Sequence, residues 1–239
     1  MSLKLSSLGW SALTLLFFYS GLVQAASGLP VRGETRDVSG FHALASNGSI
    51  HVEVRFGNRE SVRLEGDEAA IREIETVVEQ GTLKIGFKKQ AWTRNANWGK
   101  VTAYVTARKI DALSQSGSGH IVVSGKVSGD ALNAALSGSG RITVSSEVQV
   151  FNASISGSGR IVASGDVRNS NVSISGSGRL DGGNLRSRSA NLKISGSGNI
   201  SIHVDEQLDA VISGSGNVSY SGNAQTNVRT SGSGRVRKS

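Results

Sequence analysis

Three arginines occupy the same position in successive sequence repeats. Arg141, Arg160 and Arg179 each directly follow a Ser-Gly-Ser-Gly tetrapeptide. A planar guanidinium favours oxyanions, so the three predict a stripe that binds phosphorylated or sulfated polymers. On adjacent strands they would lie about 5 Å apart, close enough to repel one another. The alternative is that they only protect an exposed edge and keep the protein soluble. In the other repeats the same position holds His120, Asn199, Asn217 and Arg235.

A second basic segment, residues 88–100, combines cations with two aromatic side chains. Its candidate glycan- or anion-binding residues are Lys88, Lys89, Trp92, Arg94, Trp98 and Lys100. Aromatic rings among cations can stack on sugars or bases. The alternative is that the two Trp side chains cover a hydrophobic edge of the fold.

Two carboxylates also share a repeat position. Glu147 and Asp166 each lie ten residues after the first Ser of a tetrapeptide, so stacked repeats would bring them together. Polysaccharide-cleaving β-helices use such clusters as acid/base pairs or calcium ligands. Gly165 beside Asp166 indicates a turn that exposes both groups, so we do not expect catalysis here.

The other reactive residue types do not indicate an enzyme. The chain has no Cys, which excludes disulfides, thiolate zinc sites and thiol catalysis. Its four His residues show no metal-ligand spacing, and no Ser stands in a nucleophile elbow. We therefore expect no enzymatic activity, no metal and no cofactor. The net charge of +8 favours anionic partners.

The tetrapeptide repeat must position these residues. Successive copies are spaced 18 to 21 residues apart. They begin at Ser116, Ser137, Ser156, Ser175, Ser195, Ser213 and Ser231. A period near 20 indicates a solenoid. The alternative, a flexible Gly/Ser linker, fails because the residues between the tetrapeptides are ordered by position.

Mostly apolar residues flank the tetrapeptides and form columns. The column before them is Leu136, Ile155, Ile174, Ile194, Ile212 and Thr230, and the column after them is Ile121, Ile142, Ile161, Leu180, Ile200, Val218 and Val236. Their period-two alternation with small or polar residues predicts strands. A weaker third column is expected at Val127, Val148, Val167 and Leu185.

A polar column stands four residues before successive tetrapeptides. It consists of Asn133, Asn152, Asn171, Asn191, Asp209 and Asn227. Asn tolerates left-handed backbone, so we expect this column at a turn, with stacked amides bonded along the axis. Each repeat then forms three short strands joined by tight turns. The fold class is all-β, a right-handed parallel β-helix, whose seven tetrapeptides span roughly 30 Å.

Residues 37–115 differ from the regular repeats at 116–239. We expect them to form an elaborated first part of the same single domain, with strands at 50–54, 61–64, 83–87 and 101–106. Asp67 precedes a helix predicted over residues 69–78, with Ile71, Ile74, Val77 and Val78 on one face. The helix is expected to cap the open core.

The first 25 residues predict an export signal. Lys4 supplies a basic start, residues 8–23 are largely apolar, and the small residues Ala25 and Ala26 offer a cleavage site. Cleavage would leave a linker over residues 26–36, the domain 37–239 and no transmembrane span. The alternative is an uncleaved anchor, for which the apolar stretch is short. We expect the protein in the periplasm, at the outer membrane or outside the cell.

These features resemble the putative auto-transporter adhesin, head GIN domain family of bacterial envelope proteins. The resemblance spans about residues 37–237. It rests on Phe41-x-x-Leu44 leading to Ser49-Ile50-x-Val52, on Gly81-x-Leu83-x-Ile85, and on the repeated Gly-Ser-Gly turns. It implies an exported β-helical protein.

Together these observations predict an exported, non-enzymatic envelope protein that is adhesin-like or binds polyanions or glycans. Its expected partners are anionic envelope polymers or glycans, and no nucleic acid is expected. One alternative is a polysaccharide-acting β-helix enzyme, which a clustered, partly buried carboxylate set beside an open groove would favour. The other is a purely structural envelope spacer, favoured if no groove or charged stripe forms.

Overall fold

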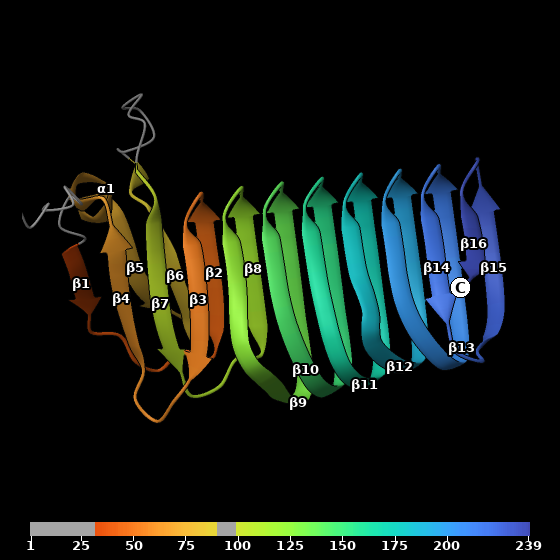
Figure 1. Cartoon of the computed structure of the whole chain (residues 1–239), viewed down its shortest axis with the longest axis horizontal. Coiled ribbons are helices and arrows are strands. Elements are labelled where there is room, and N and C mark those ends of the chain that lie inside the picture. Colours follow the sequence, from red (N-terminus) through yellow and green to blue (C-terminus); the bar gives the residue numbers. More distant parts are fainter. Residues whose placement is uncertain (1–31, 90–98) are drawn as a thin grey trace, which may run out of the picture. The chain divides into compact units, whose positions relative to one another are not determined.

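The structure is a computed structural model that describes residues 32–89 and 99–239. These residues coil into a β-solenoid of about seven turns, whose strands belong to one 16-stranded sheet. In Figure 1 the chain runs down the near side of each turn and up the far side as it advances, which makes the coil right-handed. The predicted right-handed parallel β-helix is therefore confirmed. The predicted export signal, residues 1–25, lies outside the described residues.

Each regular turn is one long strand that bends once. These strands are β9 (His120–Gly138), β10 (Arg141–Gly157), β11 (Arg160–Gly176), β12 (Arg179–Gly196) and β13 (Asn199–Gly214). After β13 the chain continues through β14 (Asn217–Ser221), β15 (Gln225–Ser231) and β16 (Arg235–Lys238). The prediction of three short strands per repeat is wrong, because pairing between β10 and β11 continues through the bend. In β11 a first arm covers residues 160–163, and a second arm covers 170–175.

Both main apolar columns are confirmed up to the last turn, where Thr230 is exposed and Val236 is only partly buried. Ile161 pairs with Ile142 on one side and with Leu180 on the other, and all three side chains are fully buried. On the second arms, Ile174 aligns with Ile155 and Ile194 in the same way. Stacking identical positions fills the coil with interlocking aliphatic side chains, which is where the hydrophobic core lies.

The predicted third column is only partly in register. Val148 pairs with Val167, but Val127 pairs with Ser146 and Leu185 pairs with Gly165. Irregularities before these positions shift the register by two residues between β9 and β10 and by one residue between β11 and β12. Their cause is the unequal length of the repeats: extra residues are absorbed in the bend, while the arms on either side stay aligned.

The Asn column lies within the second arms and not at a turn. Asn171 is exposed between the buried residues Ser170 and Val172, so its backbone is ordinary strand. Gln80 is the one non-glycine residue with positive φ among the described residues. The expected amide ladder is nevertheless present: Asn152 donates to Asn133 at 2.9 Å, and Asn171 donates to Asn152 at 2.9 Å.

The tetrapeptide turns need glycine for two reasons. Gly157 has φ of +113°, a conformation that other residues rarely adopt. A Cβ at Gly157 would also stand 2.6 Å from the carbonyl oxygen of Gly138. That oxygen accepts hydrogen bonds from the next turn, from the backbone N–H groups of Ser158 and Gly159 at 3.0 and 2.9 Å. The turns therefore stack backbone on backbone.

The N-terminal part continues the coil out of sequence order. Its strands are β2 (Ala43–Gly48), β3 (His51–Phe56), β6 (Thr82–Phe87), β7 (Val101–Ala107) and β8 (Ala112–Gly117). The turn made by β2 and β3 lies between the turn made by β6 and β7 and the turn made by β8 and β9. The predicted strands at 50–54, 61–64, 83–87 and 101–106 are all found, with bounds that differ by a few residues.

The predicted helix over residues 69–78 is wrong in extent. The helix α1 (Glu68–Arg72) is capped by Asp67, whose Oδ1 accepts a hydrogen bond from the Ala70 N–H at 2.8 Å. The following residues form β5 (Ile74–Glu79), which pairs antiparallel with β6. Ile74, Val77 and Val78 are β-branched, and the free edge of β6 offers them a strand partner.

The linker predicted over residues 26–36 is also too long. Within the described residues, β1 (Arg32–Arg36) pairs antiparallel with β4 (Ser61–Gly66). In turn β4 pairs antiparallel with β7. The five residues of β1 include no large apolar side chain, so hydrophobic patterning gives no sign of a strand that is held by backbone hydrogen bonds.

Candidate binding face

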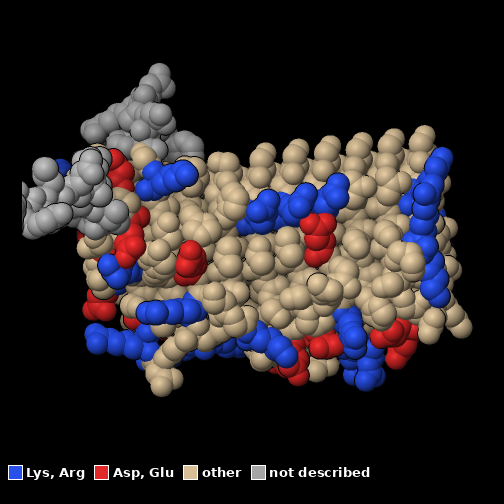
Figure 2. Space-filling model, viewed as in Figure 1, with Lys and Arg blue, Asp and Glu red and all other residues tan. Residues whose placement is uncertain are grey.

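The three repeat arginines form one row on the outside of the first arms. Arg141 pairs with Arg160, and Arg160 pairs with Arg179. They are the first residues of β10, β11 and β12, and all three are exposed. Figure 2 shows a line of basic side chains across the middle turns of this face. We call Arg141, Arg160 and Arg179 the arginine row, and the outer side of the first arms the front face.

The arginine row is incompletely neutralised. Arg160 Nη1 lies 3.3 Å from Asp181 Oδ2, in an ion pair whose side chains are 45% and 36% exposed. An ion pair this exposed contributes little to stability. Arg141 and Arg179 have no ion-pair partner within residues 32–89 and 99–239. The row therefore keeps a net positive charge that faces solvent.

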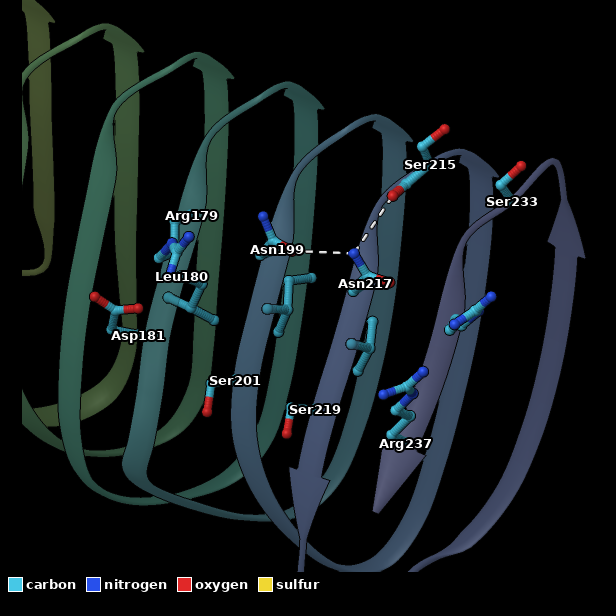
Figure 3. A pocket seen from close by; sticks show the side chains of 13 residues that line it. Arg179, Leu180, Asp181, Asn199, Ser201, Ser215, Asn217, Ser219, Ser233 and Arg237 are labelled. Atoms are coloured by element: carbon cyan, nitrogen blue, oxygen red, sulfur yellow. Dashed lines mark hydrogen bonds between the residues drawn. The ribbon is translucent and has the colours of Figure 1, made fainter. Parts of the chain in front are cut away.

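A hollow of about 560 Å³ lies on the front face beside the row (Figure 3). Pairing between successive strands aligns its two outward rows of side chains: Arg179, Asn199, Asn217 and Arg235, and Asp181, Ser201, Ser219 and Arg237. Asn and Ser side chains on β13 and β14 make the floor, and the longer arginines on β12 and β16 make the two walls, namely Arg179 on one side and Arg235 and Arg237 on the other. We call this hollow the trough.

Sequence reasoning did not find the trough. The position after each tetrapeptide already showed Asn199, Asn217 and Arg235 as equivalents of Arg179. The second row, Asp181, Ser201, Ser219 and Arg237, lies two residues further along each strand and was not predicted as a site. The contrast of short and long side chains along both rows is the signal that would have shown it.

The predicted basic segment is described only at its ends, because Trp92, Arg94 and Trp98 lie outside the described residues. Lys88 Nζ donates to the carbonyl of Arg72 at 2.6 Å. Lys89 lines a separate hollow with Ile85 and Val77. Lys100 accepts a backbone hydrogen bond from Asp67. The described ends of the segment therefore belong to the N-terminal part and not to the arginine row.

The paired carboxylates do not form a catalytic cluster. Glu147 and Asp166 are aligned as expected, but both are exposed. Glu147 Oε2 accepts a hydrogen bond from Lys126 Nζ at 2.9 Å. This bond, with the charges of Glu147 and Asp166, raises the pKa of the Lys126 ammonium above its usual value. The carboxylates thus act as partners of a surface lysine.

One polar chain near the bend was not expected from the sequence. His203 Nδ1 lies 2.8 Å from Ser221 Oγ, and its Nε2 lies 2.9 Å from Asp205 Oδ1. In a serine-nucleophile triad the imidazole faces the serine with Nε2 and the carboxylate with Nδ1. The order is reversed here, so we interpret the chain as a brace between β13 and β14.

Residues 32–89 and 99–239 contain neither a cluster of metal-binding side chains nor a membrane-spanning helix. No group of three or more His, Cys, Asp or Glu side chains there could hold a metal ion. No helix within those ranges has the length and apolar character needed to cross a membrane.

Comparison with known proteins identifies the class. The model of the putative auto-transporter adhesin, head GIN domain family matches residues 40–224. The chain therefore belongs to this family, as the resemblance in its sequence implied. No curated protein matches the chain.

Solved structures share the fold. A putative adhesin from Bacteroides fragilis is 20% identical, with a TM-score of 0.79 over 87% of this chain and 97% of that one. A protein from Parabacteroides distasonis described as a putative lipid binding protein is 24% identical, with a TM-score of 0.70 over 87% and 96%. A putative adhesin from Parabacteroides merdae is 21% identical, with a TM-score of 0.71 over 87% and 96%. At these identities the likeness concerns the fold.

Proposed function

We propose that this chain is an exported, non-enzymatic envelope protein that binds anionic polymers or glycans through the arginine row. The observation that carries the proposal is the alignment of Arg141, Arg160 and Arg179 on three consecutive strands. Like charges held this close repel one another. A bound polyanion would relieve the repulsion, so a row that is costly to the free protein favours a charged ligand.

The N-terminal sequence supports export, and the comparisons with known proteins support adhesion. The first 25 residues have the basic start, apolar stretch and small residues of a secretory signal. The family and two of the solved relatives are described as putative adhesins. The non-enzymatic part of the proposal is supported by Glu147 and Asp166, whose exposed carboxylates face solvent and a lysine.

The test compares wild-type protein with a variant that carries Arg141→Ser, Arg160→Ser and Arg179→Ser. Retention on immobilised heparin and on lipopolysaccharide is measured as the salt concentration needed for elution. The matched control is Arg59→Ser, Arg186→Ser and Arg229→Ser, which removes the same charge from exposed positions that do not pair with one another.

We expect the row variant to elute at clearly lower salt and the control to elute near the wild type, because the site is a local alignment of charge. Equal elution of wild type and row variant would reject the row as a binding site. Equal loss in both variants would show that net charge alone causes retention. Either result would favour the alternative that the arginines only protect an exposed edge and keep the protein soluble.

A further inference from the structure

We propose that the trough binds a short acidic oligosaccharide, that is, a sugar chain that carries carboxylates. The inference rests on the proposed function, since it names a ligand class for the same front face. It differs in its residues: only Arg179 belongs to both the arginine row and the trough.

The first argument is the charge of the walls. Arg179 stands on one wall and Arg237 stands on the other (Figure 3). Arg235 also lines the trough and lies on the same strand as Arg237, β16. None of these guanidinium groups has an ion-pair partner in the described part of the chain. Asp181, the carboxylate in the trough, is engaged with Arg160. Guanidinium groups bind carboxylates through paired hydrogen bonds, so the walls favour an anion.

The second argument is the chemistry of the floor. Asn199 and Asn217 present amides, and Ser201 and Ser219 present hydroxyl groups. The contacts that these amides make are long, with Asn217 Nδ2 at 3.4 Å from both Asn199 Oδ1 and the Ser215 carbonyl. Much of their capacity to donate and accept hydrogen bonds is therefore available to a ligand.

The floor distinguishes a sugar from a bare polyanion. Phosphate and sulfate oxygens accept hydrogen bonds, so they supply no donor to the amide oxygens of the floor or to Asp181 Oδ1, the oxygen that is not paired with Arg160. Sugar hydroxyls donate as well as accept, and they satisfy both kinds of group. A ligand that matches walls and floor together combines negative charge with hydroxyl groups.

The size of the trough sets the length of the ligand. Three strand-to-strand steps separate Arg179 from Arg235, which places the walls about 14 Å apart at the usual strand spacing. Its volume of about 560 Å³ is in the range of small-molecule sites. A few sugar rings laid across the strands would bring their carboxylates to both walls.

The experiment titrates the wild-type protein by calorimetry with trigalacturonate, maltotriose and tripolyphosphate. The wall variant is Arg235→Ser with Arg237→Ser, and the matched control is Arg168→Ser with Arg188→Ser. A floor variant combines Asn199→Ala with Asn217→Ala. Thermal unfolding of each variant verifies that it is folded.

We expect trigalacturonate to bind and neutral maltotriose to bind much more weakly. The wall variant should weaken trigalacturonate binding about tenfold or more, the effect of losing a charge-assisted contact. The floor variant should weaken trigalacturonate more than tripolyphosphate. Phosphate oxygens can use only the amide hydrogens, whereas sugar hydroxyls can use both the amide hydrogens and the amide oxygens.

Three results would overturn the inference: no binding of trigalacturonate, equal binding of maltotriose, or equal losses in the wall variant and its control. Failure of the proposed function is separately visible, because Arg141 and Arg160 lie outside the trough lining. Heparin retention that depends on the row, without trigalacturonate binding, would refute the trough and leave the row in place.

Discussion

In the amide ladder on the second arms, the hydrogen bonds between side chains all run in one direction, from each turn to the preceding one. From Asn152 onward, each Asn of the column donates an Nδ2 hydrogen to the Oδ1 of the preceding turn, as Asn191 does to Asn171 at 3.2 Å. Asp209 accepts from Asn227 at 2.9 Å, but an ionised carboxylate has no hydrogen to donate to Asn191. The ladder is therefore interrupted at one step.

Replacing Asp209 by Asn should complete the ladder. The new amide can donate to Asn191 and still accept from Asn227. Gln207 Nε2 donates to Asp209 Oδ2 at 2.7 Å, a bond that an amide nitrogen could not accept. Both proteins compared therefore carry Gln207→Ala. We expect a gain of about 0.5–1 kcal/mol in the free energy of unfolding, the usual net value of one hydrogen bond. Urea unfolding measures this free energy. The control is Asp130→Asn, the same substitution at an exposed position outside the ladder. A loss of stability relative to that control would show that the ladder contributes nothing.

At this scale, equal offsets from the tetrapeptides predicted which residues align. The arginine row and the Asn ladder both follow from counting, because the arms of successive turns stay in register. Where the Asn column sits was mispredicted. The turn preference of Asn is a local tendency, and burial of Ser170 and Val172 on either side of Asn171 overrides it.

The tetrapeptide turn is the element that sets the stacking. Gly157→Ala should destabilise the protein by about 2 kcal/mol or more, because the residue needs positive φ and the new Cβ meets a backbone carbonyl. Gly183→Ala is the control, since its Cβ would meet only Ser201 Oγ at 3.6 Å. Thermal and urea unfolding report both. If Gly157→Ala costs no more than Gly183→Ala, the turn does not constrain the coil.

The apolar column makes a graded prediction at the same scale. Ile161 is completely buried between Ile142 and Leu180. Ile161→Val should cost about 0.5–1.5 kcal/mol and Ile161→Ala about 2–4 kcal/mol, in proportion to the cavity left behind. Urea unfolding gives both values. A cost under about 0.5 kcal/mol for Ile161→Ala would contradict a tightly packed column.

Elements outside the regular repeats were harder to predict. Residues 74–78 fit either one face of a helix or a β-branched strand, and only the presence of β6 as a partner decides between them. The out-of-order stacking of β2–β3 between two later turns has no local signal, since strand pairing over long sequence distances determines it.

At the scale of the whole molecule, the coil places residues that are one repeat apart in the sequence side by side on one surface. Residues 19 positions apart, such as Arg141 and Arg160, become neighbours on one face. The front face then carries both the arginine row and the trough, which meet at Arg179. The row could be predicted from the sequence because it depends on register alone. The trough could not, because it also depends on how far neighbouring side chains project.

The central claim is that this local alignment of charge, and not the overall charge of +8, binds polyanions. The most direct measurement is the affinity for soluble heparin over a series of salt concentrations, for the wild type, the row variant and the control Arg59→Ser, Arg186→Ser and Arg229→Ser. Each lost contact with a polyanion should reduce the slope of log K against log salt by about one. We predict a reduction of about two to three for the row variant and little change for the control. Equal slopes for all three proteins would contradict the account.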